Sequence, residues 1–323
     1  MAAMIRLLDL PHAEARRLLA TGVPVYLTVN PVEYHGPHLS LHNDRLISEG
    51  VVRALHERLL ARHPEWPFVT AGDLDVGVEP CPGRGTHAVR FPVVRELVVG
   101  ACQALVDLGA RRVVIMTFHG SPLHNLAIEA GVTLLRAAGV RAFAPFPLVH
   151  REMLTIDPER YRDTVAHIAD PVAREALLAS LPLDLHAGFA ETSLALHFAP
   201  QSVAPEHRSL PPCPSWPTDR RADRASRAAA AIGADELASE LRFVASALGW
   251  MTVRPFPGYT GNPALATAEA GACFARVMLD RCTEAAEEVF AGRAESPAPI
   301  MRWLGPLSLG GRVGAPPPMA LDS

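Results

Sequence analysis

Short apolar runs rich in β-branched residues alternate along the chain with longer segments in which apolar residues recur at helical spacing. The short runs predict strands at 23–30, 67–71, 112–117 and from Val140 onward. The longer segments predict helices at 45–61, 93–108 and 123–137. Because strands that alternate with helices are typical of a sheet covered on both faces, we predict an α/β fold with three layers, α/β/α, around a mainly parallel central sheet.

The second half of the chain is helical at first and then loses its period. Further helices are expected near 237–248 and over the Ala-rich stretch 264–291. A proline-rich stretch at 205–217 reads as a linker, and the basic residues after it read as a solvated helix start. The last segment is rich in proline and glycine and predicts an extended arm or disorder. We therefore expect one domain over 1–293 and a C-terminal tail over 294–323.

The composition is that of an ordinary cytoplasmic enzyme. The chain has 323 residues, of which 49% are hydrophobic, and a formal net charge of −4. It therefore has no excess of basic residues with which to bind nucleic acid. No apolar run approaches the roughly 20 residues that span a membrane, and the charged residues within 1–22 do not resemble a signal peptide. The five cysteines are scattered without a Cys-x-x-Cys pair, so we expect reduced thiols.

Ionisable side chains follow two of the predicted strands where each strand ends. Glu33 and His35 come directly after the run 23–30, and their i, i+2 spacing puts both on one face of extended backbone. His119 follows the run 112–117 in the same way. Because ligands collect at the carboxyl ends of parallel strands, these side chains should point into one crevice. Asp44 stands at the start of the next helix, where helix capping alone could also explain it.

A third group lies in the segment 184–193, where small residues let the backbone approach a ligand closely. His186 and Glu191 supply ionisable groups that hydrolysis needs. Taken alone, a loop histidine and a glutamate favoured by the helix dipole would explain them equally well. Their coincidence with the two strand ends favours a functional site.

These blocks, read in order, resemble the creatininase (creatinine amidohydrolase) family over residues 23 to about 290. The resemblance is carried by Glu33-x-His35-Gly36-Pro37-His38-Leu39, by Asp44, by His119-Gly120, by His186-Ala187-Gly188-x-x-Glu191-Thr192-Ser193 and by Gly261-Asn262-Pro263-x-x-Ala266-Thr267-Ala268-Glu269-x-Gly271. It implies a single layered α/β/α domain, often assembled into hexamers, so we expect a homo-oligomer. It also implies a centre with one or two divalent metal ions per subunit.

The resemblance also implies a role for each site residue. Glu33, His35, Asp44 and His119 match the metal-ligand positions, with Asp44 at the bridging position. His186 matches the candidate proton donor, and Glu191 matches the acidic partner that orients or ligates. Two carboxylates and two imidazoles suit zinc, our first expectation, and also manganese or iron.

The expected reaction is hydrolysis of a carbon–nitrogen amide bond in a small amide, cyclic or linear, by metal-activated water with His186 protonating the leaving nitrogen. Formamide deformylation, trimming of a short peptide and a non-catalytic, metabolite-binding role remain alternatives. One departure bears on the metal count. Creatininase itself has a Glu two residues after the histidine that matches His119, whereas this chain has Gly120-Ser121-Pro122. A second metal site then depends on Glu191 or on another group.

Two stretches, 72–92 and 148–183, are poorly patterned. The second is long enough to act as an arm over a pocket or as a subunit contact, and the sequence leaves both open.

Overall fold

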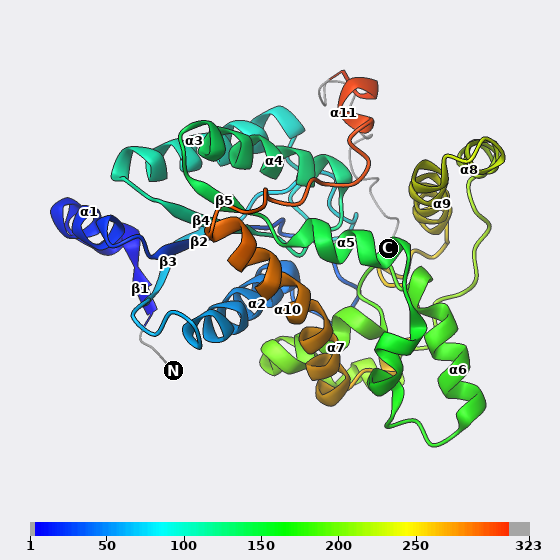
Figure 1. Ribbon diagram of the computed structural model, residues 1–323. Helices are drawn as coiled ribbons and strands as arrows, with labels where there is room; N and C mark the ends of the chain where they lie inside the picture. The colour runs from blue at the N-terminus through cyan, green and yellow to red at the C-terminus, as the bar shows by residue number, and fades with distance from the viewer. Residues whose placement is uncertain (1–3, 310–323) are drawn as a thin grey trace.

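The central sheet has five strands, all parallel, in the order β1-β3-β2-β4-β5 (Figure 1). The computed structural model describes residues 4–309. The strands are Met4–Arg6 (β1), Pro24–Val29 (β2), Phe68–Leu74 (β3), Arg112–Met116 (β4) and Arg141–Phe143 (β5). All six residues of β2 are buried, as its uninterrupted apolar character predicts. The four predicted strands are confirmed, and β1 was missed because only three residues pair.

Helices cover both faces of the sheet, so the three-layer prediction is confirmed (Figure 1). One face carries α3 (Phe91–Leu108) and α4 (Pro122–Ala137), and the other carries α2 (Asn43–Leu60) and α10 (Ala268–Phe290). The remaining helices are α1 (His12–Ala20), α5 (Phe146–Leu154), α6 (Pro171–Ser180), α7 (Phe189–Phe198), α8 (Arg220–Ala231), α9 (Asp235–Trp250) and α11 (Leu304–Leu307).

The predicted start of the last helix, residue 264, was wrong. Residues Pro263–Leu265 form a 3-10 turn, and the hydroxyl of Thr267 accepts a hydrogen bond from the Ala270 N–H at 3.1 Å. That side-chain cap begins α10 at Ala268 instead. The sequence shows the Ala-rich period but not which of several small polar residues caps it.

The sheet brings two chain segments to one edge. β2 and β4 are neighbours, and Thr28 pairs with Met116 near their carboxyl ends. Just beyond β2, the side-chain carbonyl of Asn30 accepts hydrogen bonds from the Phe118 N–H after β4 and from the Ser48 hydroxyl in α2, each at 3.0 Å. This amide therefore fixes the two strand ends and the first turns of α2 relative to one another.

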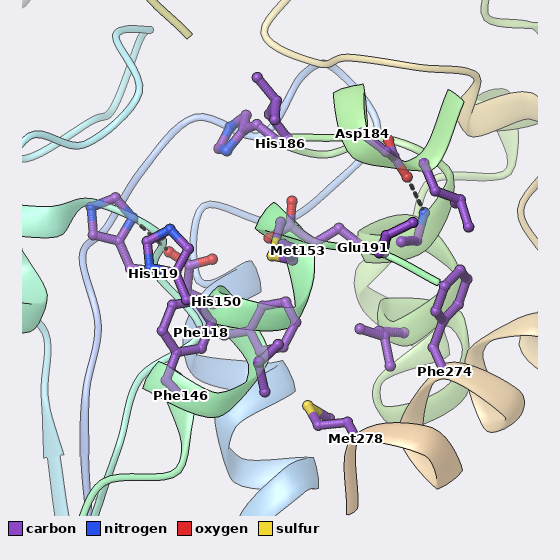
Figure 2. Close-up of a pocket in the computed structure, with 18 of the residues that line it drawn as sticks. Phe118, His119, Phe146, His150, Met153, Asp184, His186, Glu191, Phe274 and Met278 are labelled. Atoms are coloured by element: carbon purple, nitrogen blue, oxygen red, sulfur yellow. Dashed lines mark hydrogen bonds and ion pairs between the residues drawn. The ribbon is translucent and has the colours of Figure 1, made fainter. Parts of the chain in front are cut away.

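The poorly patterned stretch 148–183 forms much of one wall of a pocket (Figure 2). It contains the end of α5, a 3-10 segment at Pro158–Val165 and α6. The pocket opens onto the carboxyl edge of the sheet, since Glu33 and His119 also line it. Of the two roles that the sequence left open, the structure therefore shows the arm over a pocket.

The tail packs against the body of the protein as far as it is described. Ile300 and Met301 are buried, and the Glu240 carboxylate in α9 accepts hydrogen bonds from the Met301 N–H and the Trp303 indole, each at 2.7 Å. The expected extended arm is interrupted by α11 at Leu304–Leu307, and residues 310–323 lie outside the described part. The five cysteines are free thiols, as predicted. Within residues 4–309, no helix is long and apolar enough to cross a membrane.

Candidate metal centre

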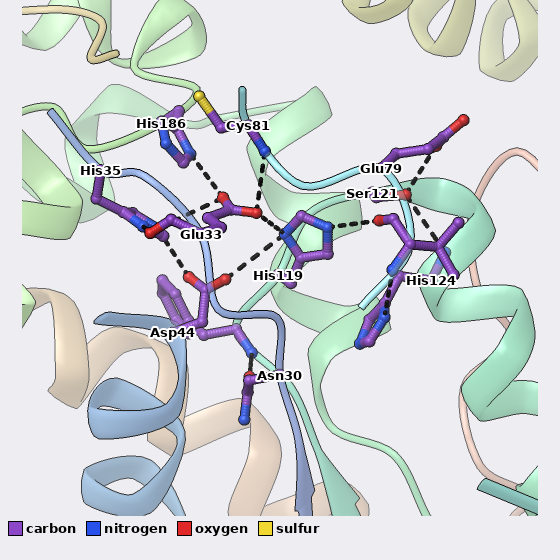
Figure 3. A network of polar contacts seen from close by, with 12 residues as sticks. Asn30, Glu33, His35, Asp44, Glu79, Cys81, His119, Ser121, His124 and His186 are labelled. Carbon is purple, nitrogen blue, oxygen red and sulfur yellow. Dashed lines mark hydrogen bonds and ion pairs between the residues drawn. The ribbon is translucent and has the colours of Figure 1, made fainter. Parts of the chain in front are cut away.

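Six ionisable side chains from four segments converge at the carboxyl edge of the sheet (Glu191 is labelled in Figure 2, the others in Figure 3). They are Glu33 and His35 after β2, Asp44 in the first turn of α2, His119 after β4, His186 before α7 and Glu191 in the first turn of α7. The structure thus brings together all six site residues that the sequence predicted. They fall into three overlapping groups whose ligand atoms lie within 4.8 Å of one another.

Asp44 stands between two of these groups. Its Oδ1 lies 3.0 Å from His35 Nε2, and its Oδ2 lies 3.5 Å from His119 Nδ1. Among the described residues, none donates a hydrogen bond to the buried Oδ2. The capping explanation of Asp44 is wrong, because the N-cap of α2 is His42 and Asp44 points into the cluster. A buried carboxylate oxygen without a donor is an observation that a bound cation would explain.

Glu33 lies on the side of the cluster opposite Asp44 (Figure 3). Its Oε2 lies 3.1 Å from His119 Nδ1 and accepts a hydrogen bond of 3.2 Å from the Cys81 N–H. Its Oε1 lies 3.3 Å from His186 Nδ1. The side chain is only 1% exposed, so its charge must be offset inside the protein.

The three histidines share one arrangement. Each has one ring nitrogen within hydrogen-bond distance of a backbone carbonyl oxygen. His35 Nδ1 lies 3.1 Å from Glu33 O, His119 Nε2 lies 2.9 Å from Val78 O, and His186 Nε2 lies 2.9 Å from Tyr34 O. Because a carbonyl only accepts, that nitrogen carries the proton. In a neutral imidazole the second nitrogen then offers a lone pair, and in all three rings it faces carboxylate oxygens. This is how histidines are held when they bind metal.

Glu191 lies at the open side of the cluster. Its Oε1 is 3.7 Å from His35 Nε2, and its Oε2 accepts a hydrogen bond from the Ala187 N–H. With His35 and Asp44 it forms one of the three groups that could hold a metal. The backbone bond to Ala187 fixes the carboxylate in the loop that also carries His186.

The electrostatics of the cluster favour positive charge at its centre. Burial alone would lower the pKa of His35, but Asp44 and Glu191 raise it well above its ordinary value. Burial alone would raise the pKa of Asp44, yet the surrounding histidines, His35 foremost, lower it. Three carboxylates buried with neutral imidazoles leave uncompensated negative charge. A divalent cation would offset it and would displace the proton that His35 otherwise attracts.

Residues from the stretch 72–92 orient the cluster through backbone atoms, which the sequence could not reveal. Val78 O accepts from His119, and the Cys81 N–H donates to Glu33. His124 in α4 supports this segment. Its Nδ1 accepts a hydrogen bond from the Val78 N–H at 3.4 Å, and its Nε2 lies 3.1 Å from Val29 O. Burial lowers the pKa of His124 to about 3, so it stays neutral as a positioning residue. The only signal was a histidine inside a helical period.

Other residues of the recognised blocks join the blocks to one another. The Thr192 hydroxyl lies 2.9 Å from His38 Nε2, and the Ser193 hydroxyl accepts from the Thr267 N–H at 3.3 Å. Directly before the last block, the Thr260 N–H donates to His186 O at 2.8 Å. Their place in the motif is therefore explained by packing around the centre rather than by contact with a metal.

Asp184 holds the loop between His186 and Glu191. Its two carboxylate oxygens accept hydrogen bonds from the Phe189 N–H at 3.0 Å and the Ala190 N–H at 2.6 Å, at the start of α7. Burial raises the pKa of this carboxyl to about 7. The loop can pass so close only because residue 188 is glycine: a Cβ there would collide with Asp184 Oδ1 and lie 2.8 Å from Thr260 O.

We expect Gly188→Ala to destabilise the protein by about 1–3 kcal/mol, because overpacking forces Asp184 away from α7. Gly100→Ala is the matched control, since Gly100 lies within α3 and a Cβ there meets nothing within 4 Å. The control should leave stability unchanged or raise it by up to about 1 kcal/mol. Urea unfolding of both variants measures the difference, and equal midpoints would contradict the close-approach argument.

The family model described as "Creatininase: Creatinine amidohydrolase" matches residues 9–286. A "Mycofactocin precursor peptide peptidase" from Mycobacterium ulcerans (strain Agy99) is 26% identical over 278 residues, 85% of this chain and 88% of that protein. Among solved structures, a creatinine amidohydrolase (creatininase) is 21% identical with a TM-score of 0.57, over 90% of this chain and 98% of the other. A structure titled "Creatininase Mn" has the same identity and TM-score over 90% and 99%.

A mutant creatininase described as Zn-Zn type gives a TM-score of 0.59 at 19% identity, over 90% of this chain and 99% of the other. These structural likenesses show the shared fold. The family model covers most of the chain and includes every residue of the cluster from Glu33 to Glu191. The chain belongs to the creatininase family.

Proposed function

We propose that this protein is a metal-dependent hydrolase of a carbon–nitrogen amide bond. The observation that carries the proposal is the shared arrangement of His35 and His119, which each direct a lone pair toward buried carboxylates. The unpartnered Oδ2 of Asp44 supports the same conclusion. The family, one of amidohydrolases, gives the reaction class. Creatininase structures with zinc and with manganese are known, and both metals agree with this donor set.

Glu33, Asp44 and His119 would hold one divalent ion, and His35, Asp44 and Glu191 a second, with Asp44 shared between them. When bound, such an ion supplies Lewis acidity and lowers the pKa of a water molecule to about 7. Burial lowers the pKa of His186, so its imidazole is neutral at pH 7. His186 Nδ1 can then accept a proton and return it to the leaving nitrogen, which must be protonated to depart.

This chain has Ser121 at the position where creatininase carries a carboxylate, two residues after the histidine matching His119, and Glu191 is the third carboxylate of the cluster. We expect one tight metal per subunit, and a second that depends on Glu191. Glu191→Gln should lower the affinity of the second site first, because the amide keeps the shape but loses the charge that offsets the ion's desolvation. Titrating metal-free protein with zinc measures both sites.

Glu49→Gln is the control for that titration, since Glu49 is half-exposed and pairs with Arg45 outside the cluster. It should leave both affinities unchanged. Two tight equivalents that survive Glu191→Gln would mean that another residue completes the second site.

Metal analysis tests the function itself. Purified protein should contain zinc, manganese or iron, and a chelator should abolish hydrolysis of a panel of small amides, with recovery when metal returns. Metal-free protein that hydrolyses amides at the full rate would contradict the proposal. Protein that binds metal but hydrolyses no amide would favour a non-catalytic role.

A second candidate is the trimming of a short peptide, which the mycobacterial relative, a peptide peptidase by name, favours. Deformylation of a formamide remains an alternative within the family. Short peptides and formamides therefore belong in the same panel. A cytoplasmic location and a homo-oligomer, in the family often a hexamer, remain predictions.

A further inference from the structure

A cavity of about 120 Å³ lies directly against the metal cluster (Figure 2). One side of its lining is the cluster itself, with Glu33, Asp44, His119, His186 and Glu191. The other sides come from the stretch 148–183 and from α5, α7, α9 and α10. A group that entered this cavity would therefore touch the reacting centre at one end only.

The walls away from the cluster are mostly apolar and combine aromatic with aliphatic and methionine side chains. They include Phe118, Phe146, Met153, Phe243, Phe274 and Met278. A void of this size is uncommon in a protein interior, which is packed to the density of an organic crystal. An apolar cavity of about 150 Å³ stays dry and binds benzene, so this one is sized for a single ring or a branched chain rather than for a cluster of waters.

The polar groups of these walls carry no free charge toward the cavity. His150 is 1% exposed, and burial lowers its pKa to about 3, so its imidazole is neutral. Its Nε2 has no hydrogen-bond partner among the described residues, and its ring packs between Phe146 and Phe243, with centroids 5.5 Å away in each case. The Asp184 oxygens are engaged with the N–H groups of α7. A charged substituent would find no partner here.

We propose that the substrate of this protein is an amide bearing a ring-sized apolar group, which occupies this cavity while the amide meets the cluster. The inference rests on the proposed amide hydrolysis and specifies its substrate class. The side chains that set this specificity lie in the poorly patterned stretch and in the helices facing it. Met153 and Met278 are flexible apolar side chains that can adapt to the shape of such a group.

Two pairs of amides test the proposal on the metal-loaded protein. The first pair is 3-phenylpropionamide and propionamide, with the ring on the acyl side, and the second is N-benzylacetamide and N-methylacetamide, with the ring on the amine side. In at least one pair we expect the ring compound to bind about 100-fold more tightly, because burial of a phenyl group removes its apolar surface from water. Calorimetry measures affinity, and turnover gives kcat/KM.

Two variants of the cavity lining and one surface control test whether the advantage of the ring arises in the cavity. Met153→Trp should fill it and remove the advantage of the ring, whereas Arg151→Trp, on the exposed face of the same helix, should preserve it. Met278→Ala should enlarge the cavity and shift the preference from phenyl to naphthyl, a gain that a misfolded protein cannot imitate.

Equal affinity within both pairs would overturn the proposal, as would a ring advantage that survives Met153→Trp. Tight, cavity-dependent binding of ring amides without turnover of any amide would support the cavity assignment and refute the proposed hydrolysis. The binding and rate measurements thus separate the two failures.

Discussion

Asp44→Ala should remove both the bound metal and the hydrolytic activity. Asp44 belongs to two of the three candidate ligand groups, with Oδ1 toward His35 and Oδ2 toward His119, and it is the carboxylate that joins the group of His119 to the group of Glu191. Without it, Glu33 and Glu191 would be the remaining carboxylates, with only His35 Nε2 between them at 3.6 and 3.7 Å from their oxygens. We expect no retained metal by elemental analysis and hydrolysis at the background rate.

Asp44→Asn sharpens the test, because the amide keeps the shape of the side chain and loses its charge. If Asp44 only stabilised α2 through the helix dipole, this change would lower the free energy of unfolding by less than about 1 kcal/mol and leave the metal bound. Glu49→Gln on the same helix should behave like the native protein. One or more equivalents of metal with normal activity in Asp44→Ala would refute the bridging role.

The location of the site was predictable because two physical signals coincide in the sequence. Two uninterrupted apolar runs are each followed by ionisable residues, and buried parallel strands present their carboxyl ends at one edge. The structure shows β2 and β4 side by side, and Glu33, His35 and His119 meet there. His186 and Glu191 are candidates from their own segment, but nothing in that segment shows that it reaches this edge of the sheet. Their roles come only from the resemblance to the family.

The support of the site was not predictable, because it is made largely by main-chain atoms. No sequence pattern marks that Val78 O orients His119 or that the Cys81 N–H holds Glu33. A backbone carbonyl or N–H is present at nearly every residue, so only its position in space distinguishes it. The stretch that contains both looked like an unpatterned loop for the same reason.

The cavity could not be predicted from the sequence, for a different reason. Helical periodicity reports which residues face a core, but a concave wall is built from several short segments that each contribute one or two side chains. Met153 and Ile156 come from one such segment, and Phe243 and Phe274 come from distant helices. None of these forms a stripe that distinguishes a pocket from a core.

His186→Ala separates two roles that the geometry allows for this residue. As a proton donor, His186 contributes about 10²–10⁴-fold to the rate, and its removal should leave the metal content unchanged. Its Nδ1, however, lies 3.3 Å from Glu33 Oε1 and belongs with Glu33 and His35 to a group that could hold a metal. We expect the first outcome, a slow enzyme with its full complement of metal.

The leaving group of the substrate distinguishes the loss of a proton donor from the loss of metal. An alkylamine must be protonated to depart, whereas p-nitroaniline departs far more easily, so His186→Ala should slow an alkylamide much more than the matching p-nitroanilide. His167→Ala is the control: His167 is exposed, and its Nε2 bonds Leu265 O at 3.0 Å away from the cluster. If His186 is instead a ligand, both substrates should slow by the same factor and the metal content should fall. Full metal content with a loss confined to the alkylamide would identify His186 as the residue that delivers the proton.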